Sequence, residues 1–308
     1  MKQLRRLDVP KPQGPYRKAQ LGLLRHVDLS EVNFQALEQE RPDLIIEEGD
    51  AVLIGQPFRR AVSLHYAFPD RDAFARQFPD MFERLLAVPL DQDETPLGFR
   101  LTLTDRPSRP YLEPVLFAHA FELSREWMEM TLVELPEGGA LSDDIAPGFR
   151  LRPARPDDAD ALVQLEEQAF PTLLLPADHV LAVLGTATAV YRILEESASA
   201  RPVGFLRLRA GAPGAGHISD FAVHPDSQRR GLGEAMLRWA LAWFRSEGLR
   251  RAILTVSVDN APAIALYRKL GFTSGEVGVD YRRPIDEEEA RHVLEKHRAA
   301  HSRVRHRT

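Results

Sequence analysis

Hydrophobic and polar residues alternate along short runs of the second half of the chain, as is typical of half-buried strands. The alternation predicts strands at about residues 148–153, 189–194, 203–209, 217–223, 252–258 and 276–282. Apolar residues at spacings of three and four predict helices at about 157–170, 231–247 and 261–270, and a short one at 176–184. Asp157 or Asp158 is expected to cap the first helix. This order predicts an α/β fold (an α+β mixed sheet), mostly antiparallel, twisted and flanked by helices.

The first half of the chain repeats the same order of elements, β-α-β-β-β-α-β-α-β. A short strand follows Gly22, Ser30 is expected to cap the next helix, and an apolar strand ends in Pro-Asp in both halves. Residues 136–147 carry prolines, two adjacent glycines and no apolar periodicity, which indicates a linker. The sequence therefore predicts an internal duplication with domains at 1–135 and 148–285, followed by a helical, basic tail at 286–308.

Composition limits the classes of function. The 308 residues suit two domains of roughly 150 residues each. No run of about 18 apolar residues predicts a membrane span, and the first residues lack the apolar core of a secretory signal, so we expect a cytoplasmic protein. The chain has no cysteine, which excludes disulfides, thiolate metal sites and cysteine nucleophiles; no metal is expected. A net charge of -5 disfavours a nucleic-acid partner.

A glycine-rich turn stands between the strand at 217–223 and the helix that follows it. Residues 228–233 read QRRGLG. The first amides of a helix have no internal partner and form an anion site that suits phosphate. Arg229 and Arg230 add positive charge, and Gly231 and Gly233 let a bulky anion approach the backbone. The alternative is that the two glycines only shape a turn.

Two motifs in this order resemble the GNAT superfamily of N-acetyltransferases. The turn is similar to the family's acyl-CoA pyrophosphate loop, and residues 260–272, NAPAIALYRKLGF, are similar to its N-x-x-A-x-x-L-Y-x-x-x-G-F block. The resemblance covers about residues 148–285 and implies acetyl-CoA as co-substrate. It also implies the positions that contact the coenzyme: Phe221, Ala222, Val223, Gln228, Arg229, Arg230, Gly231, Leu232, Gly233, Glu234, Asn260 and Tyr267.

Three residues are candidates for proton transfer. By resemblance, Tyr267 donates a proton to the leaving thiolate, whereas a random tyrosine on a helix more often only packs. His217 stands where several family members carry a carboxylate, and Asp220 competes with it as general base from the opposite side of the strand. Either can be an ordinary polar residue, and a base acting through water stays open. Asn260 is equally well explained as a helix cap.

The first half lacks the features that would hold a coenzyme. At the matching position it has no glycine, Asp70 and Asp72 would repel a diphosphate, and Pro79 is expected to interrupt the helix. We therefore expect a degenerate domain that has lost the acyl-CoA site and forms one wall of the acceptor pocket. This layout is similar to that of mycothiol synthases.

The resemblance implies transfer of an acetyl group from acetyl-CoA to a primary amine by direct attack, because an acyl-cysteine is impossible here. The expected acceptor is an unknown small molecule. A protein N-terminal or lysine acetyltransferase and a non-catalytic acyl-CoA sensor are the alternatives, and Tyr267 argues against the sensor. We expect a monomer or homodimer with no membrane partner.

Overall fold

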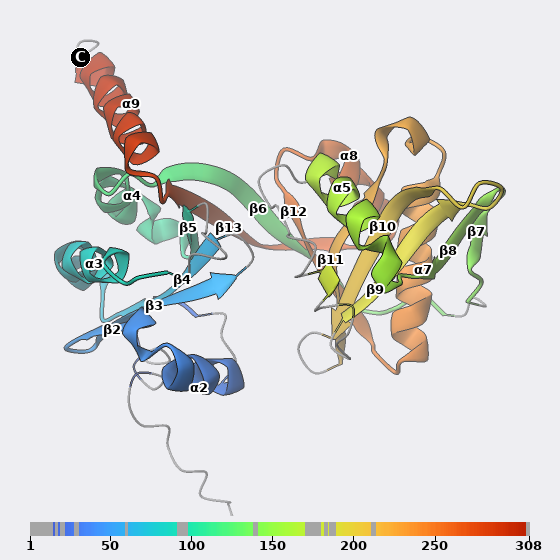
Figure 1. The fold of residues 1–308 in the computed structure, drawn as a ribbon, viewed down its shortest axis with the longest axis horizontal. Coiled ribbons are helices and arrows are strands. Elements are labelled where there is room, and N and C mark those ends of the chain that lie inside the picture. Colours follow the sequence, from blue (N-terminus) through green and yellow to red (C-terminus); the bar gives the residue numbers. More distant parts are fainter. Residues whose placement is uncertain are drawn as a thin grey trace, which may run out of the picture. The chain divides into compact units, whose positions relative to one another are not determined.

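The computed structural model describes most of the chain, in two compact units (Figure 1). The first unit contains residues 1–124 and 279–308, and the second contains residues 125–278. The described residues are 22–27, 31–58, 61–90, 98–137, 141–169, 189–210 and 214–305, together with Pro15, Lys18, Val180, Leu181 and Leu184. The cap expected at Ser30 and most of the short helix expected at 176–184 lie outside them.

The first unit has a mixed sheet with helices on both faces. Its strands follow the order β2-β3-β4-β5-β13, β1 pairs with β4, and only β4 and β5 run parallel. Helices α3 and α4 pack on one face, and Phe34 of α2 packs on the other. The elements are β1 (Leu24–His26), α2 (Glu31–Glu40), β2 (Ile45–Glu48), β3 (Ala51–Phe58), β4 (Ala61–Phe68), α3 (Arg71–Leu86), β5 (Gly98–Leu103), α4 (Arg109–Ala118), the start of β6 (Glu122–Leu132), the end of β13 (Thr273–Pro284) and α9 (Glu287–Arg305).

The second unit repeats this architecture. Its strands follow the order β6-β12-β11-β10-β9-β8-β7, and only β11 and β12 run parallel. Helix α7 packs on one face of the sheet and α5 on the other, in separate apolar clusters. The elements are β7 (Asp144–Ala146), β8 (Phe149–Pro153), α5 (Ala159–Ala169), β9 (Ala189–Glu196), β10 (Pro202–Ala210), β11 (Ala215–Val223), α7 (Leu232–Ser246), β12 (Arg251–Ser257) and α8 (Ala261–Lys269).

The repeated order β-α-β-β-β-α-β-α-β is confirmed in both halves, but the unit boundaries differ from the expected domain limits. Strand β6 leaves the first unit, and its residues Trp127–Leu132 pair with β12 in the second. Strand β13 makes the reverse passage, and Val279–Pro284 pair with β5. The expected linker contains β7, which pairs with β8. Alternation identifies a strand but not its neighbour, so the sequence could not show this exchange.

Helices α3 and α9 of the first unit bear on two of the expectations from the sequence. The interruption expected at Pro79 is wrong, because α3 runs continuously through it. Phe74, Phe78 and Phe82 stack along α3 with ring centroids 4.6 and 5.4 Å apart, and this packing outweighs one missing backbone hydrogen bond. The tail forms α9, which is anchored by the His297 ring, 4.4 Å from that of Phe117.

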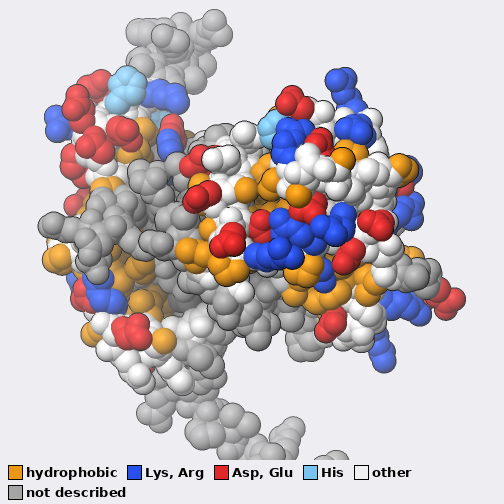
Figure 2. Space-filling view, turned by 45° about the vertical axis from the view of Figure 1, so that its right-hand side comes forward, with side chains coloured by type: hydrophobic (Ala, Val, Ile, Leu, Met, Phe, Trp, Pro, Cys, Tyr) orange, Lys and Arg blue, Asp and Glu red, His pale blue; other side chains and the backbone are white. Residues whose placement is uncertain are grey.

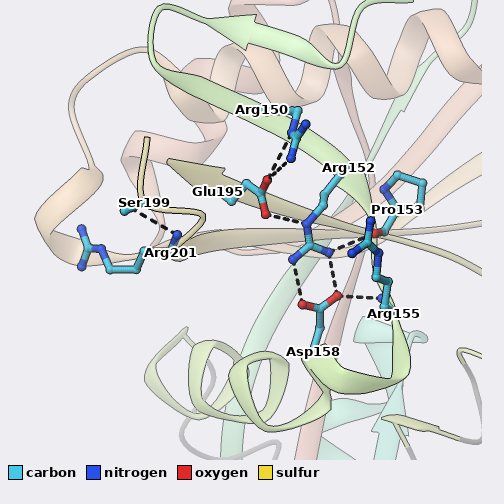
Figure 3. Close-up of polar contacts among 8 residues, drawn as sticks. All are labelled: Arg150, Arg152, Pro153, Arg155, Asp158, Glu195, Ser199 and Arg201. Atoms are coloured by element: carbon cyan, nitrogen blue, oxygen red, sulfur yellow. Dashed lines mark hydrogen bonds and ion pairs between the residues drawn. The ribbon is translucent and has the colours of Figure 1, made fainter. Parts of the chain in front are cut away.

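An ionic network fixes the start of α5 on the edge of the second unit's sheet (Figure 3). Glu195 of β9, only 1% exposed, binds Arg150 and Arg152 of β8. Arg152 also donates two hydrogen bonds, of 2.7 and 2.8 Å, to Asp158, whose pKa these bonds lower. Asp158 accepts the Arg155 N–H as well, so this residue, rather than Asp157, caps the start of the helical segment.

The charge distribution on the surface and the character of the helices are those expected from the composition. Figure 2 shows basic and acidic side chains interspersed on the visible face. Among the described residues, no helix combines the length and apolar character needed to cross a bilayer.

Candidate functional site

The second unit's sheet opens between its two parallel strands. Residues 215–218 of β11 pair with residues 251–254 of β12, and beyond them β11 pairs only with β10. The His224 N–H donates to Val203 O on β10 at 2.7 Å, and backbone groups alternate in direction along a strand. The peptide groups of Phe221 and Val223 therefore face the gap between β11 and β12. A gap lined by backbone donors and acceptors can take an extended, amide-containing chain.

A β-bulge reorients the residues at the start of this gap. His217 is opposite Arg209, and Asp220 is opposite Arg207, which leaves Ser219 without a cross-strand partner on β10. Arg207 and Arg209 are two residues apart and share a face, so His217 and Asp220 share it too. The expectation that these two candidates point to opposite sides is wrong. A spacing of three residues predicts opposite faces only in a regular strand.

The glycine-rich turn becomes the start of α7. Gly231 is the N-cap with a φ of 77°, and a Cβ built there would meet nothing within 4 Å. No acceptor in the described part of the chain takes a hydrogen bond from the backbone N–H groups of Gly231, Leu232, Gly233 or Glu234. The Gln228 side chain donates to Val223 O at 2.9 Å and holds the turn against β11. The helix start is thus a fixed, open set of donors, as an anion site requires.

The two arginines of the turn have different surroundings. The Arg230 guanidinium lies 4.5 Å from the centre of the Phe149 ring on β8, a cation–π contact that anchors the turn to the sheet. Arg229 is exposed and has a left-handed backbone with a φ of 59°, which is costly for a residue other than glycine. Of the two arginines, Arg230 therefore packs on the sheet and Arg229 does not. The sequence alone did not distinguish their roles.

Three other residues predicted to contact the coenzyme have side chains that already bind or pack against other parts of the protein. Glu234 binds Lys269 of α8 at 2.5 Å and Arg238 at 2.9 Å, and the Lys269 hydrogen bond lowers its pKa. Leu232 is buried in the core on the α7 face, and Ala222 packs against the cluster on the α5 face. These three residues could contact a coenzyme only through their backbone.

Helix α8 brings the second motif to the gap. Asn260 accepts the Ala263 N–H at 3.2 Å, as a helix cap. The Tyr267 ring lies 6.2 Å from that of Phe221, and Gly233 faces Leu266. Tyr267 is 6% exposed, and burial raises its pKa, so the phenol stays protonated at neutral pH. No acceptor among the described residues takes a hydrogen bond from its hydroxyl.

The two base candidates differ in their electrostatic surroundings. Burial, followed by the charges of Arg209 and Arg207, lowers the pKa of His217 to about 4, so its imidazole is neutral at pH 7. Its Nδ1 lies 3.3 Å from Ser219 Oγ. The Asp220 carboxylate is instead ion-paired with Arg207. That pairing favours the ionised form of the carboxylate.

Sequence reasoning missed Phe149, Lys269 and Arg207, although each holds a predicted site residue. Lys269 lies within the second motif, but its partner Glu234 is far away in the chain. Phe149 and Arg207 carry no motif, and only cross-strand register, which a single sequence does not give, could have found them.

Comparisons with known proteins agree with this geometry. The sequence profile of the Acetyltransferase (GNAT) family matches residues 160–272. The chain is 43% identical over 96 residues to a mycothiol acetyltransferase of Saccharomonospora viridis, covering 29% of this chain and 31% of that protein. It is 34% identical over 142 residues to a mycothiol acetyltransferase of Clavibacter michiganensis, covering 44% and 46%. The chain thus spans less than half the length of these two relatives.

Two solved structures share the fold over more of the chain. A GCN5-related N-acetyltransferase from Sphaerobacter thermophilus superposes with a TM-score of 0.56 at 19% identity, covering 76% of each chain. A tandem GNAT protein from the clavulanic acid biosynthesis pathway gives 0.53 at 15% identity, covering 87% of this chain and 91% of that one. Residues 160–272 therefore form a domain of the GNAT acetyltransferase family.

Proposed function

We propose that this protein transfers an acetyl group from acetyl-CoA to a primary amine at the β11–β12 gap of the second unit. The observation that carries the proposal is the set of backbone donors at the start of α7, open above Gly231 and adjacent to a gap lined by the backbone of Phe221 and Val223. A ligand with an anionic group followed by an extended, amide-containing chain would match both the donors at the start of α7 and the gap.

The residues present fit the coenzyme. The amides of residues 231–234 would hold its diphosphate, with the exposed Arg229 as counter-charge. The peptide groups of Phe221 and Val223 would pair with the pantetheine amides in the gap. Val223 O already accepts from Gln228, which leaves one of its lone pairs free. When bound, acetyl-CoA supplies a thioester whose carbonyl carbon an amine can attack.

Two residues would move the protons. His217 is neutral at pH 7 and would take one proton from the acceptor's ammonium group, giving a free amine that forms the new C–N bond as the C–S bond breaks. Tyr267 stays protonated and would donate its proton to the departing sulfur. The phenolate then recovers a proton from the amide nitrogen, and the proton on His217 goes to solvent. The chain has no cysteine, so no acyl-cysteine can form.

A small-molecule amine is the proposed acceptor class. Both curated relatives described above are named as mycothiol acetyltransferases. Cross-strand pairing places His217 beside Arg209 and on the same face as Asp220, so the acceptor would meet charged groups there.

Release of free thiol from acetyl-CoA, measured with a panel of primary amines, tests this proposal. We expect amine-dependent thiol release, and Tyr267→Phe should abolish most of it while acetyl-CoA still binds. Binding of acetyl-CoA without turnover of any amine would favour the sensor, and no binding would contradict the proposal entirely.

A further inference from the structure

Beside the neutral His217, one face of the β10–β11 pair carries charged side chains that the transfer chemistry alone does not require. The face is the one covered in part by α5, and it presents Arg207, Arg209, His217 and Asp220. It is the opposite face from α7, whose start would hold the coenzyme. A thioester held in the gap would thus be open on this side to an attacking amine.

The two arginines of this face are not equivalent. Arg207 forms the ion pair with Asp220, donates to Tyr191 Oη at 3.3 Å, and has a side chain only 13% exposed. Arg209 is exposed, and none of its described neighbours forms an ion pair with it. It stands directly opposite His217, at the spacing of cross-strand neighbours, about 5 Å between Cβ atoms. A guanidinium therefore stands beside the group that would receive the amine's proton.

Resting on the proposed function, we propose that Arg209 is a specificity-determining residue that binds an anionic group of the acceptor, so that the acceptor class is an amine carrying a carboxylate or phosphate close to its amino group. A bare amine gains nothing from Arg209, because its ammonium form is repelled by the guanidinium. An anionic substituent pairs with the guanidinium and brings the amino group to His217.

Of the two arginines that β10 presents on this face, Arg209 is the one with no ion pair among the described residues. Asp220 and Arg207 neutralise each other. The buried Glu166 of α5 lies on the same side of the sheet, but the charges that act on His217 are those of Arg209 and Arg207. The site beside His217 is thus electropositive, and a carboxylate and a phosphate share the chemistry that fits it.

Matched pairs of acceptors test the inference: glycine against glycinamide for a carboxylate, and phosphoethanolamine against ethanolamine for a phosphate. The quantity measured is the ratio of kcat/KM for the anionic and neutral members, at one pH and saturating acetyl-CoA. Intrinsic differences in amine reactivity cancel when the ratio is compared between protein variants. We expect Arg209→Gln to lower the ratio about tenfold for the pair that contains the preferred anion, and Arg209→Glu to lower it further.

Arg201→Gln is the control, because it removes the same charge at the other end of β10, where Arg201 is paired with Glu196. An unchanged ratio in both Arg209 variants overturns the inference, and so does an equal change in Arg201→Gln. If the parent protein did not bind acetyl-CoA, the proposed function itself would be overturned instead.

A second measurement does not depend on turnover. N-Acetylglycine and its amide are titrated against the protein while the NMR signals of the His217 ring are followed. We expect saturable shifts with the acid that are lost in Arg209→Gln. Equal or absent responses to the acid and the amide, with N-acetylphosphoethanolamine giving no response either, overturn the inference.

Discussion

The starts of helices α3 and α7 occupy the same place in the two units and differ in what fills them. Only Pro69 and Asp70 connect β4 to α3, whereas residues 224–231 connect β11 to α7. Asp70 turns its carboxylate onto its own helix and accepts the Ala73 N–H at 2.7 Å. At α7 the cap is Gly231, which has no side chain, and the donors stay open. In the first unit a carboxylate of the protein occupies the helix start, and in the second unit the helix start can accept the anionic group of a ligand.

The neighbouring helix start shows the same contrast. In the first unit, Arg71 donates to Ser108 Oγ at 2.7 Å, and Ser108 in turn binds Asp105, so the start of α3 is tied to the start of α4. Ser108 is fully buried. In the second unit, the connection between α7 and α8 is Glu234–Lys269, at the far end of α8. The first arrangement ties the start of α3 to the start of α4, and the second ties the start of α7 to the end of α8.

The gap between the parallel strands exists in both units. In the first unit only residues 62–64 of β4 pair with β5. There the buried Tyr66 donates its hydroxyl to Thr102 O at 3.1 Å and bridges the strands. In the second unit the Tyr267 hydroxyl is held by no such bond among the described residues. We infer that the first unit keeps the fold and has lost the coenzyme site, because its own side chains satisfy the groups that a coenzyme would use.

The largest expected effect separates the two tyrosines. Tyr267→Phe should lower kcat by about 10²- to 10⁴-fold, the usual contribution of a general acid, with acetyl-CoA affinity nearly unchanged. Tyr66→Phe should leave kcat unchanged and lower the free energy of unfolding by about 1 kcal/mol. Steady-state kinetics and denaturant titration measure both. Equal kcat values for Tyr267→Phe and the parent protein would show that Tyr267 is not the proton donor.

Transferring the first unit's carboxylate into the second should close the coenzyme site. Gly231→Asp places a negative charge at the start of α7, where aspartate tolerates the left-handed backbone better than most residues. We expect acetyl-CoA affinity to fall about tenfold or more, measured by calorimetry. The matched variant Asp70→Ala should lose about 1 kcal/mol of stability through its missing cap and bind acetyl-CoA as before. Unchanged affinity in Gly231→Asp would contradict the anion site.

Each unit holds a histidine whose charged form is disfavoured, and pH separates their roles. Burial is the main cause in both cases, and lowers the pKa of His65 to about 3 and of His217 to about 4. An unfolded histidine takes up its proton near pH 6.5, so each residue makes the folded protein lose stability as the pH falls from about 6.5 toward its folded value.

We therefore expect His65→Asn and His217→Asn each to flatten the fall in stability between pH 6.5 and 4, as followed by denaturant titration. Only His217→Asn should also lower kcat at pH 7. If His65→Asn lowered kcat as much, His217 would have no special role in proton transfer.

The smallest expected effect distinguishes a glycine kept for a ligand from one that shapes a turn. A Cβ at Gly233 would meet Leu266 at 3.7 Å, an ordinary contact, and the residue lies within α7. Gly233→Ala should therefore stabilise the free protein by about 0.5–1 kcal/mol. It should weaken acetyl-CoA binding if the diphosphate approaches the backbone at this residue. A thermal shift and a binding titration together decide, and stabilisation without weaker binding would leave Gly233 no role beyond the turn.

Local pattern predicted the elements of the fold well, because strands and helices differ in hydrophobic period. The turn at 228–233 and the block at 260–272 were likewise recognisable, since their glycines and caps act on neighbouring residues. Features set by pairing across strands were not predictable. The bulge at Ser219 reversed the predicted arrangement of His217 and Asp220, and the exchange of β6 and β13 moved the unit boundaries. Both depend on register, which a single sequence leaves open.

The stoichiometry of acetyl-CoA binding, measured by isothermal titration calorimetry on the full chain, tests the contrast between the units most directly. We expect one site per chain, lost or strongly weakened in Gly231→Asp and intact in Asp70→Ala. Two equivalent sites, or one site that survives Gly231→Asp at full affinity, would contradict it.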